Sequence, residues 1–122
     1  MIGVGVDLVE IPRFREVIAR TPSIVDRVFT DAERAYADRH RDPAPRLAVR
    51  FAAKEAAMKA LGVGLGSMAL RDIEVRRDDA TGRPSLHLHN GAAALAAERG
   101  VARWELSLSH TDGLAQATAI AL

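Results

Sequence analysis

The stretch that decides the fold runs from residue 46 to residue 61 and reads Arg-Leu-Ala-Val-Arg-Phe-Ala-Ala-Lys-Glu-Ala-Ala-Met-Lys-Ala-Leu. It contains neither glycine nor proline, and most of its residues are strong helix formers. Pro45 precedes it and Gly62 follows it, which is the usual punctuation at the two ends of a helix. The sequence therefore predicts a long central helix over Arg46–Leu61.

Successive residues of such a helix are turned by about 100°, so its side chains fall on distinct faces. One face carries a basic stripe and another carries small residues; these are Arg46, Arg50 and Lys54, and Val49, Ala53, Ala56 and Ala60. Glu55 and Lys59 lie one turn apart, with apolar surface on both sides. They form either a solvated i,i+4 salt bridge, worth about 0.3–0.5 kcal/mol, or a carboxylate and an ammonium group that line a cleft.

The composition bounds the class of protein. The 122 residues, 48% hydrophobic and 27% charged, predict a single domain over residues 1–122. A net charge of +1 indicates no general nucleic-acid binding. The absence of cysteine excludes disulfides, thiolate metal sites and cysteine nucleophiles, and it fits a reducing compartment. Few aromatic residues and many alanines predict a lean core, which oligomerisation would help to complete.

The apolar beginning, Met1–Val9, is interrupted by Asp7 and is too short for a signal peptide or a membrane span. We therefore expect a cytoplasmic protein without a membrane partner. The alternation over Ile2–Ile11 predicts a β-strand in which Gly3, Gly5, Asp7 and Val9 share one face. Glycine in a strand often marks the close approach of a backbone or a ligand. Because an unpaired buried carboxylate is costly, we interpret Asp7 as a functional residue rather than as a strand-ending turn residue.

Further elements follow in order along the chain. Pro12 begins a predicted helix to about Arg20, with Phe14, Val17 and Ile18 facing inward. Thr30 and Glu33 form a predicted capping box at the start of a helix to about Arg39. The remaining predicted elements are strands at Ile73–Arg77 and Ser85–His89, with His87 and His89 facing solvent, a helix capped by Asn90 that ends at Gly100, and a hairpin of Trp104–His110 and Ala115–Leu122 around Asp112-Gly113.

Four polar residues fall on faces that are otherwise apolar or cleared by glycine: Asp7, Glu55, Lys59 and His110. Two carboxylates without cysteine or clustered histidine suit a hard cation such as Mg²⁺, which also takes substrate phosphates and water as ligands. Lys59 and the basic stripe could neutralise phosphate oxygens, and the loop Gly62–Gly66 could admit a phosphate or form a simple turn. The residues alone therefore predict Mg²⁺-dependent phosphoryl-type chemistry, although a lone His110 is more often structural.

Three segments resemble the 4′-phosphopantetheinyl transferases. They are Gly5-Val6-Asp7-Leu8-Val9-Glu10-Ile11, the run from Arg50 to Ala60 with its Lys-Glu-Ala-Ala-Met-Lys core, and Ser107-Leu108-Ser109-His110-Thr111. The similarity extends over essentially the whole chain, and the short length points to the holo-acyl-carrier-protein synthase subgroup.

The resemblance implies transfer of the phosphopantetheine arm of coenzyme A to a serine of an acyl carrier protein, with release of 3′,5′-ADP, in fatty-acid and lipid biosynthesis. It implies that Asp7 and Glu55 hold Mg²⁺ on the pyrophosphate and that Lys59 supports the phosphate or the leaving group. His110 and Arg50 would contact the nucleotide end of coenzyme A. The base that accepts the serine proton is Glu55 or a metal-held water, and the sequence leaves both open.

The resemblance also implies an α+β fold with an antiparallel sheet, and a homotrimer with active sites between subunits. In the glycine loop, backbone groups of Gly62 and Gly64 would contact coenzyme A. The family often has threonine where this chain has Val63, so a hydroxyl contact is not expected there.

Acyl carrier proteins are acidic, so a local basic patch must attract one. The outer face of the Pro12–Arg20 helix offers Arg13, Arg15 and Arg20 against Glu16, although a merely solvated helix face has the same appearance. Two other classes of function use the same residues: a Mg²⁺-dependent hydrolase of a nucleotide or pyrophosphate, and a ligand-binding oligomer without catalysis. The preferred carrier, fatty-acid or polyketide, is left open.

Overall fold

The computed structural model describes all 122 residues. Its elements, in chain order, are β1 (Gly3–Glu10), α1 (Ile11–Arg20), α2 (Ser23–Val28), α3 (Asp31–Ala37), α4 (Ala44–Leu61), the 3₁₀ turn η1 (Leu70–Asp72), β2 (Ile73–Arg77), β3 (Pro84–Leu88), α5 (Asn90–Glu98), β4 (Trp104–His110) and β5 (Leu114–Ala121). The predicted α+β class with an antiparallel sheet and a long central helix is confirmed.

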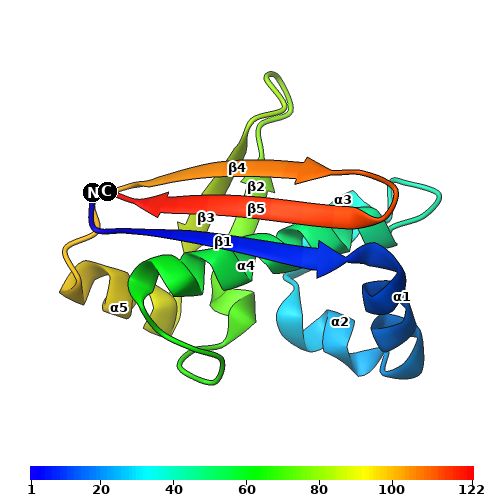
Figure 1. Ribbon diagram of the computed structural model, residues 1–122, viewed down its shortest axis with the longest axis horizontal. Coiled ribbons are helices and arrows are strands. Elements are labelled where there is room, and N and C mark those ends of the chain that lie inside the picture. The colour runs from blue at the N-terminus through cyan, green and yellow to red at the C-terminus, as the bar shows by residue number, and fades with distance from the viewer.

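The main sheet has three antiparallel strands in the order β1-β5-β4, and β2 and β3 form a separate antiparallel hairpin. Figure 1 shows the sheet lying across α4, with α1, α2 and α3 near one end of α4 and α5 near the other. Both chain termini lie at the same end of the sheet, where the amide of Ile2 donates to the carbonyl of Ala121 at 2.7 Å. None of the helices has the length and hydrophobicity that crossing a membrane requires.

The glycines of β1 allow α4 to lie directly against the sheet. A Cβ atom on Gly3 would come within 1.9 Å of the carbonyl oxygen of Ala60, and one on Gly5 would come equally close to that of Ala56. The inward residues of β5 are also small, which lets α4 lie close to this strand as well. They are four fully buried alanines: Ala115, Ala117, Ala119 and Ala121. Of the two interpretations of these glycines, close approach of a backbone is the one that the structure supports.

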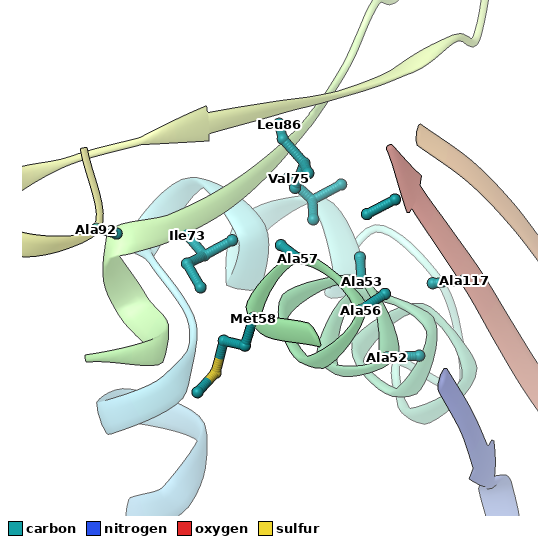
Figure 2. Packing of buried hydrophobic residues seen from close by; sticks show 11 residues of the cluster. Ala52, Ala53, Ala56, Ala57, Met58, Ile73, Val75, Leu86, Ala92 and Ala117 are labelled. Carbon is teal, nitrogen blue, oxygen red and sulfur yellow. The ribbon is translucent and has the colours of Figure 1, made fainter. Parts of the chain in front are cut away.

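Most of α4 is buried, and its alanines form the centre of the main hydrophobic core. Figure 2 shows Ala53, Ala56 and Ala57 of α4, with Ala117 of β5 close by and Val75 on another side of the helix. A second cluster packs α1 and α3 against the first half of α4, and its largest members are Ile11, Phe14, Phe29, Leu47 and Val49. The small side chains bring the backbones close together, which fixes the positions of the residues at the edges of α4.

The prediction of a basic stripe on α4 is wrong for one of its three residues, which lies in the core and not on a cleft. Lys54 is completely buried, and its ammonium group donates to Glu33 at 2.8 Å and to the carbonyl oxygens of Ile73 and Leu70 at 2.6 and 3.1 Å. Glu33 also accepts from the amides of Val75 and Thr30. The capping box of α3 is therefore present, and its glutamate additionally fastens α3 to α4 and β2.

Other departures from the sequence-based elements are local. Helix α4 begins at Ala44, two residues before the predicted start, and α2 was not predicted. Val17 is exposed rather than inward-facing. His87 and His89 are half-buried, because His89 bonds to Glu74 at 3.0 Å and His87 bonds to Arg76 and Ser85.

Candidate active site

Asp7 lies beside Glu55 because of the spacing of β1 against α4. Two strand residues advance about 6.7 Å and four helical residues advance about 6 Å. Since Gly3 faces Ala60 and Gly5 faces Ala56, the next inward residue of β1 meets the preceding turn of α4. Asp7 therefore emerges at the edge of α4 that carries Glu55.

Lys59 holds Asp7 in place. Its ammonium group donates to Oδ1 of Asp7 at 3.0 Å and to the carbonyl oxygen of Val6 at 2.9 Å. The Asp7 side chain is only 17% exposed, whereas that of Lys59 is 54% exposed. The pair Glu55–Lys59 forms no salt bridge, because Lys59 pairs with Asp7 instead. Of the two residues, Glu55 lines a cleft and Lys59 does not.

Asp7 and Glu55 lie on an open cleft of 610 Å³ at the β1 edge of the sheet, which we call the carboxylate cleft. Its lining comes from β1, α1, α4 and the start of β5: Asp7, Leu8, Val9, Glu10, Arg13, Phe14, Val17, Phe51, Glu55 and Leu114. Burial raises the pKa of Glu55 above its usual value, and the neighbouring charge of Asp7 raises it further, while Lys59 lowers it. The two carboxylates are therefore close enough to repel each other.

This donor set fits a hard divalent cation. Two carboxylates whose charges repel across a cleft are stabilised by a cation placed between them, and oxygen ligands are those that Mg²⁺ prefers. No third histidine, aspartate or glutamate completes a metal-binding cluster with them. A Mg²⁺ ion held by Asp7 and Glu55 would therefore take its remaining ligands from water and substrate phosphates.

Arg50 and His110 lie on a different cleft, of 360 Å³, at the β4 edge of the sheet, which we call the cationic cleft. Its lining comes from α3, α4, β4 and the β2–β3 hairpin: Tyr36, Arg46, Val49, Arg50, Arg77, Gly82, Pro84, Leu106, Ser107, Leu108 and His110. The strand register places Asp7, Ala117 and Leu108 in one row across the sheet, and α4 packs beneath the buried alanine in the middle. Within one chain, α4 thus separates the two clefts.

Arg50 is the most unusual charge of the cationic cleft. Its residue is 5% exposed, and it has no carboxylate partner; its Nη1 donates to the carbonyl oxygen of Arg46 at 3.3 Å, and its Nε is buried without a partner. Burial lowers the pKa of this guanidinium. A buried cation with free donors is costly unless an anion reaches it. The cleft is therefore suited to an anionic group such as a phosphate.

The other predicted site residues lie outside the two clefts or at their rims. Gly62 ends α4 in the left-handed conformation with φ 75°, so its place in the fold is that of a helix cap, and Gly64 faces open space. Arg13 of α1 reaches the carboxylate cleft, whereas Arg15 is paired with Asp42 at 2.5 Å. Arg20 is exposed at the end of α1.

Sequence reasoning missed Tyr36 and Arg77, which line the cationic cleft together with Arg50. They come from α3 and from the β2–β3 hairpin, so no local pattern joins them to α4.

The fold and the two clefts define a protein with two separate candidate sites, a pair of carboxylates suited to a metal at the β1 edge of the sheet and a buried arginine suited to an anion at the β4 edge. The chain belongs to the 4′-phosphopantetheinyl transferase superfamily, whose family model matches residues 3–119. It is 48% identical over 120 residues to the holo-[acyl-carrier-protein] synthase of Moorella thermoacetica, with 98% of this chain and 93% of the relative covered. The corresponding enzyme of Salinispora arenicola is 46% identical over 121 residues, with 99% and 98% covered.

Solved structures agree with this assignment. The holo-[acyl-carrier-protein] synthase of Neisseria meningitidis superposes with a TM-score of 0.90 at 29% identity, covering 100% of this chain and 98% of the other. That of Helicobacter pylori, solved in complex with coenzyme A, superposes with a TM-score of 0.85 at 26% identity, covering 98% and 99%. These comparisons confirm the family that the three sequence segments suggested.

Proposed function

We propose that this protein transfers the 4′-phosphopantetheine group of coenzyme A to a serine of an acyl carrier protein and releases 3′,5′-ADP. The observation that carries the proposal is the carboxylate cleft itself, in which Lys59 fixes Asp7 next to Glu55. The relatives named holo-[acyl-carrier-protein] synthase, which match over almost their whole length, support it. The coenzyme A complex of the Helicobacter pylori structure supports coenzyme A as the donor.

In the reaction, the serine oxygen forms a bond to the β-phosphorus of coenzyme A, and the bond from that phosphorus to the ADP oxygen breaks. Asp7 and Glu55 would hold Mg²⁺, which when bound neutralises charge on the pyrophosphate oxygens. Lys59 orients Asp7 and keeps its ammonium group beside the leaving phosphate. The serine proton has two possible acceptors, Glu55, which has no hydrogen bond or ion pair within the protein, and a water held by the metal.

The nucleotide end of coenzyme A suits the cationic cleft. Besides its pyrophosphate, coenzyme A has one other anionic group, the 3′-phosphate of its ribose. With the pyrophosphate at Asp7 and Glu55, this phosphate would pair with Arg50 and with His110 and Arg46 of the same cleft. The backbone of the glycine loop at Gly62 and Gly64 would follow the pantetheine side of the ligand.

Mass spectrometry of an apo carrier protein tests the proposal directly. After incubation with this protein, coenzyme A and Mg²⁺, the carrier is expected to gain the mass of the phosphopantetheine arm, and 3′,5′-ADP is expected in equal amount. Hydrolysis products without a modified carrier would indicate a nucleotide or pyrophosphate hydrolase instead. Binding of coenzyme A without turnover would indicate a non-catalytic ligand-binding oligomer.

We also propose that the protein is a homotrimer with active sites between subunits. The outward face of β1 is apolar and roughly half exposed at Ile2, Val4, Val6 and Leu8, which is unusual for the surface of a monomer. The two clefts lie at opposite edges of the sheet, along β1 and β4. Figure 1 shows these strands as the two outer strands, on either side of β5. A β1 edge placed against the β4 edge of a neighbouring copy would bring one cleft of each kind together for a single coenzyme A.

Val4→Asp is expected to convert the trimer to a monomer and to reduce transfer at least tenfold, because a charge on the apolar face of β1 would be buried without a partner in the interface. Light scattering and the transfer assay measure the two effects. Ala94→Asp is the matched control, since Ala94 is exposed on α5, lines neither cleft and should tolerate the same charge. A fully active monomer would contradict the interfacial site.

For the carrier protein, we propose the face of α1 that carries Arg13, Arg15 and Arg20. Arg13 supports this most strongly, because it lines the cleft that contains Asp7 and Glu55 and has no ion-pair partner. Arg15 contributes less charge to an approaching acidic protein, because Asp42 neutralises it.

Arg13→Gln is expected to raise the KM for carrier protein about three- to tenfold and to leave the KM for coenzyme A nearly unchanged, since rim charges act chiefly on encounter. Arg15→Gln removes the same charge two residues away and should have a smaller effect. The difference between the unmodified protein and Arg13→Gln in KM for carrier protein should shrink as the salt concentration is raised until the Debye length is about 8 Å. Equal salt dependence of the two proteins would place the docking surface elsewhere.

A further inference from the structure

Tyr36, the one tyrosine of the chain, lies on α3 at the cationic cleft and is surrounded by guanidinium groups. The guanidinium carbon of Arg50 lies 4.3 Å from the centre of its ring, and those of Arg39 and Arg77 lie at 5.7 and 5.9 Å. Tyr36 belongs to neither hydrophobic cluster of the core. Its ring therefore contacts cations rather than filling apolar space.

The Arg50 cation contacts the ring of Tyr36 and the carbonyl oxygen of Arg46. Arg50 has no carboxylate within ion-pair distance, and its Nε has no hydrogen-bond partner. An aromatic face attracts a cation most strongly where the cation is desolvated, as Arg50 is here. Because the attraction engages the face of the guanidinium and only Nη1 has a hydrogen-bond partner, the other N–H groups of Arg50 remain unpaired at the cleft that it lines.

The same ring links two elements that no backbone pairing joins. Arg50 is on α4 and Arg77 is at the end of β2, and both line the cationic cleft. The guanidinium groups of Arg50 and Arg77, which would otherwise repel each other, thus both contact one ring, and Asp79 pairs with Arg77 at 3.6 Å. A dianionic phosphate beside that ring would be recognised by both arginines.

We propose that Tyr36 is a positioning residue that makes this protein selective for coenzyme A over 3′-dephospho-coenzyme A, by holding Arg50 and Arg77 for the 3′-phosphate. The inference rests on the proposed function, since it takes coenzyme A as the donor. The phenol touches no reacting atom, so its loss should change the binding of the donor rather than the chemical step.

The test compares coenzyme A with 3′-dephospho-coenzyme A as donors for three variants. Tyr36→Leu is expected to raise the KM for coenzyme A about tenfold, with kcat and the KM for the dephosphorylated donor changed less than about twofold. Tyr36→Phe keeps the aromatic face and should keep the preference. Arg39→Gln is the matched control, because Arg39 contacts the same ring but does not line the cationic cleft.

Thermal unfolding establishes that each variant is folded, and Tyr36→Gln replaces Tyr36→Leu if the latter does not fold. The inference is overturned if Tyr36→Leu retains the preference, if Tyr36→Phe loses as much of it as Tyr36→Leu, or if the unmodified protein uses both donors equally well. These outcomes leave transfer intact in the unmodified protein. Absence of transfer from coenzyme A to any carrier would instead refute the proposed function.

Discussion

Asp7→Asn and Glu55→Gln are each expected to reduce phosphopantetheine transfer by at least about 100-fold, which is the scale seen when a group that stabilises transition-state charge is removed. Both side chains face one cleft, and together they are its best candidates for holding a divalent cation. The assay is run over a range of Mg²⁺ concentrations, so that a weakened metal site appears as a raised requirement for Mg²⁺. Glu98→Gln on the exposed end of α5 removes an equal charge far from both clefts and serves as the control.

The same Glu55→Gln variant is expected to unfold no more easily than the unmodified protein at neutral pH in the absence of metal. Burial and the charge of Asp7 raise the pKa of Glu55 in the folded state, so the folded protein binds this proton more tightly than the unfolded chain does. The contribution of Glu55 to stability is therefore favourable at low pH and is lost as the pH rises through the folded-state pKa. In denaturant unfolding, the free energy of unfolding of Glu55→Gln should rise relative to that of the unmodified protein as the pH is raised from about 4 to 7.

Unchanged transfer in either variant at all Mg²⁺ concentrations would remove Asp7 and Glu55 from the site. A large loss of stability in Glu55→Gln would show that the carboxylate has a structural partner instead. Either result can be separated from misfolding, because stability and transfer are measured on the same samples.

The carboxylate cleft was predictable from the sequence because periodicity alone determines which residues share a face. Alternation in β1 placed Asp7 on the glycine-cleared side, and helical spacing placed Glu55 and Lys59 together on one edge of α4. The sequence could not show which partner Lys59 takes, because Asp7 is 52 residues away and is brought near only by the contact of Gly3 and Gly5 with α4.

The cationic cleft was less predictable because four separate parts of the fold build it: α3, α4, β4 and the β2–β3 hairpin. Helical spacing correctly put Arg46 and Arg50 on one face of α4. It also put Lys54 on that face, and only the packing of α3 and β2 against α4 shows that Lys54 is enclosed. Local periodicity thus gives the direction of a side chain, whereas the neighbour that covers it depends on the tertiary fold.

Lys54→Met is expected to destabilise the protein by about 3–5 kcal/mol, which is the usual cost of leaving one member of a buried ion pair without its partner. Lys54 and Glu33 are both completely buried as side chains, and the ammonium group satisfies two backbone carbonyls as well as the carboxylate. Burial lowers the pKa of Lys54, so the fold tolerates this charge only because those acceptors surround it. For a domain of this size the melting temperature should fall by about 10–20 °C.

Lys59→Met is the matched control on the same helix, because Lys59 is half exposed and its pairing with Asp7 should contribute less than about 1 kcal/mol. The double variant Lys54→Met, Glu33→Gln should be more stable than the sum of the single changes predicts, since it removes the unpaired charge while the introduced carboxamide keeps an oxygen for the amide of Val75. Additive losses would show that the pair does not act as a unit. A loss below about 1 kcal/mol for Lys54→Met would show that water reaches Glu33 and that the α3–α4–β2 junction is not sealed as the structure has it.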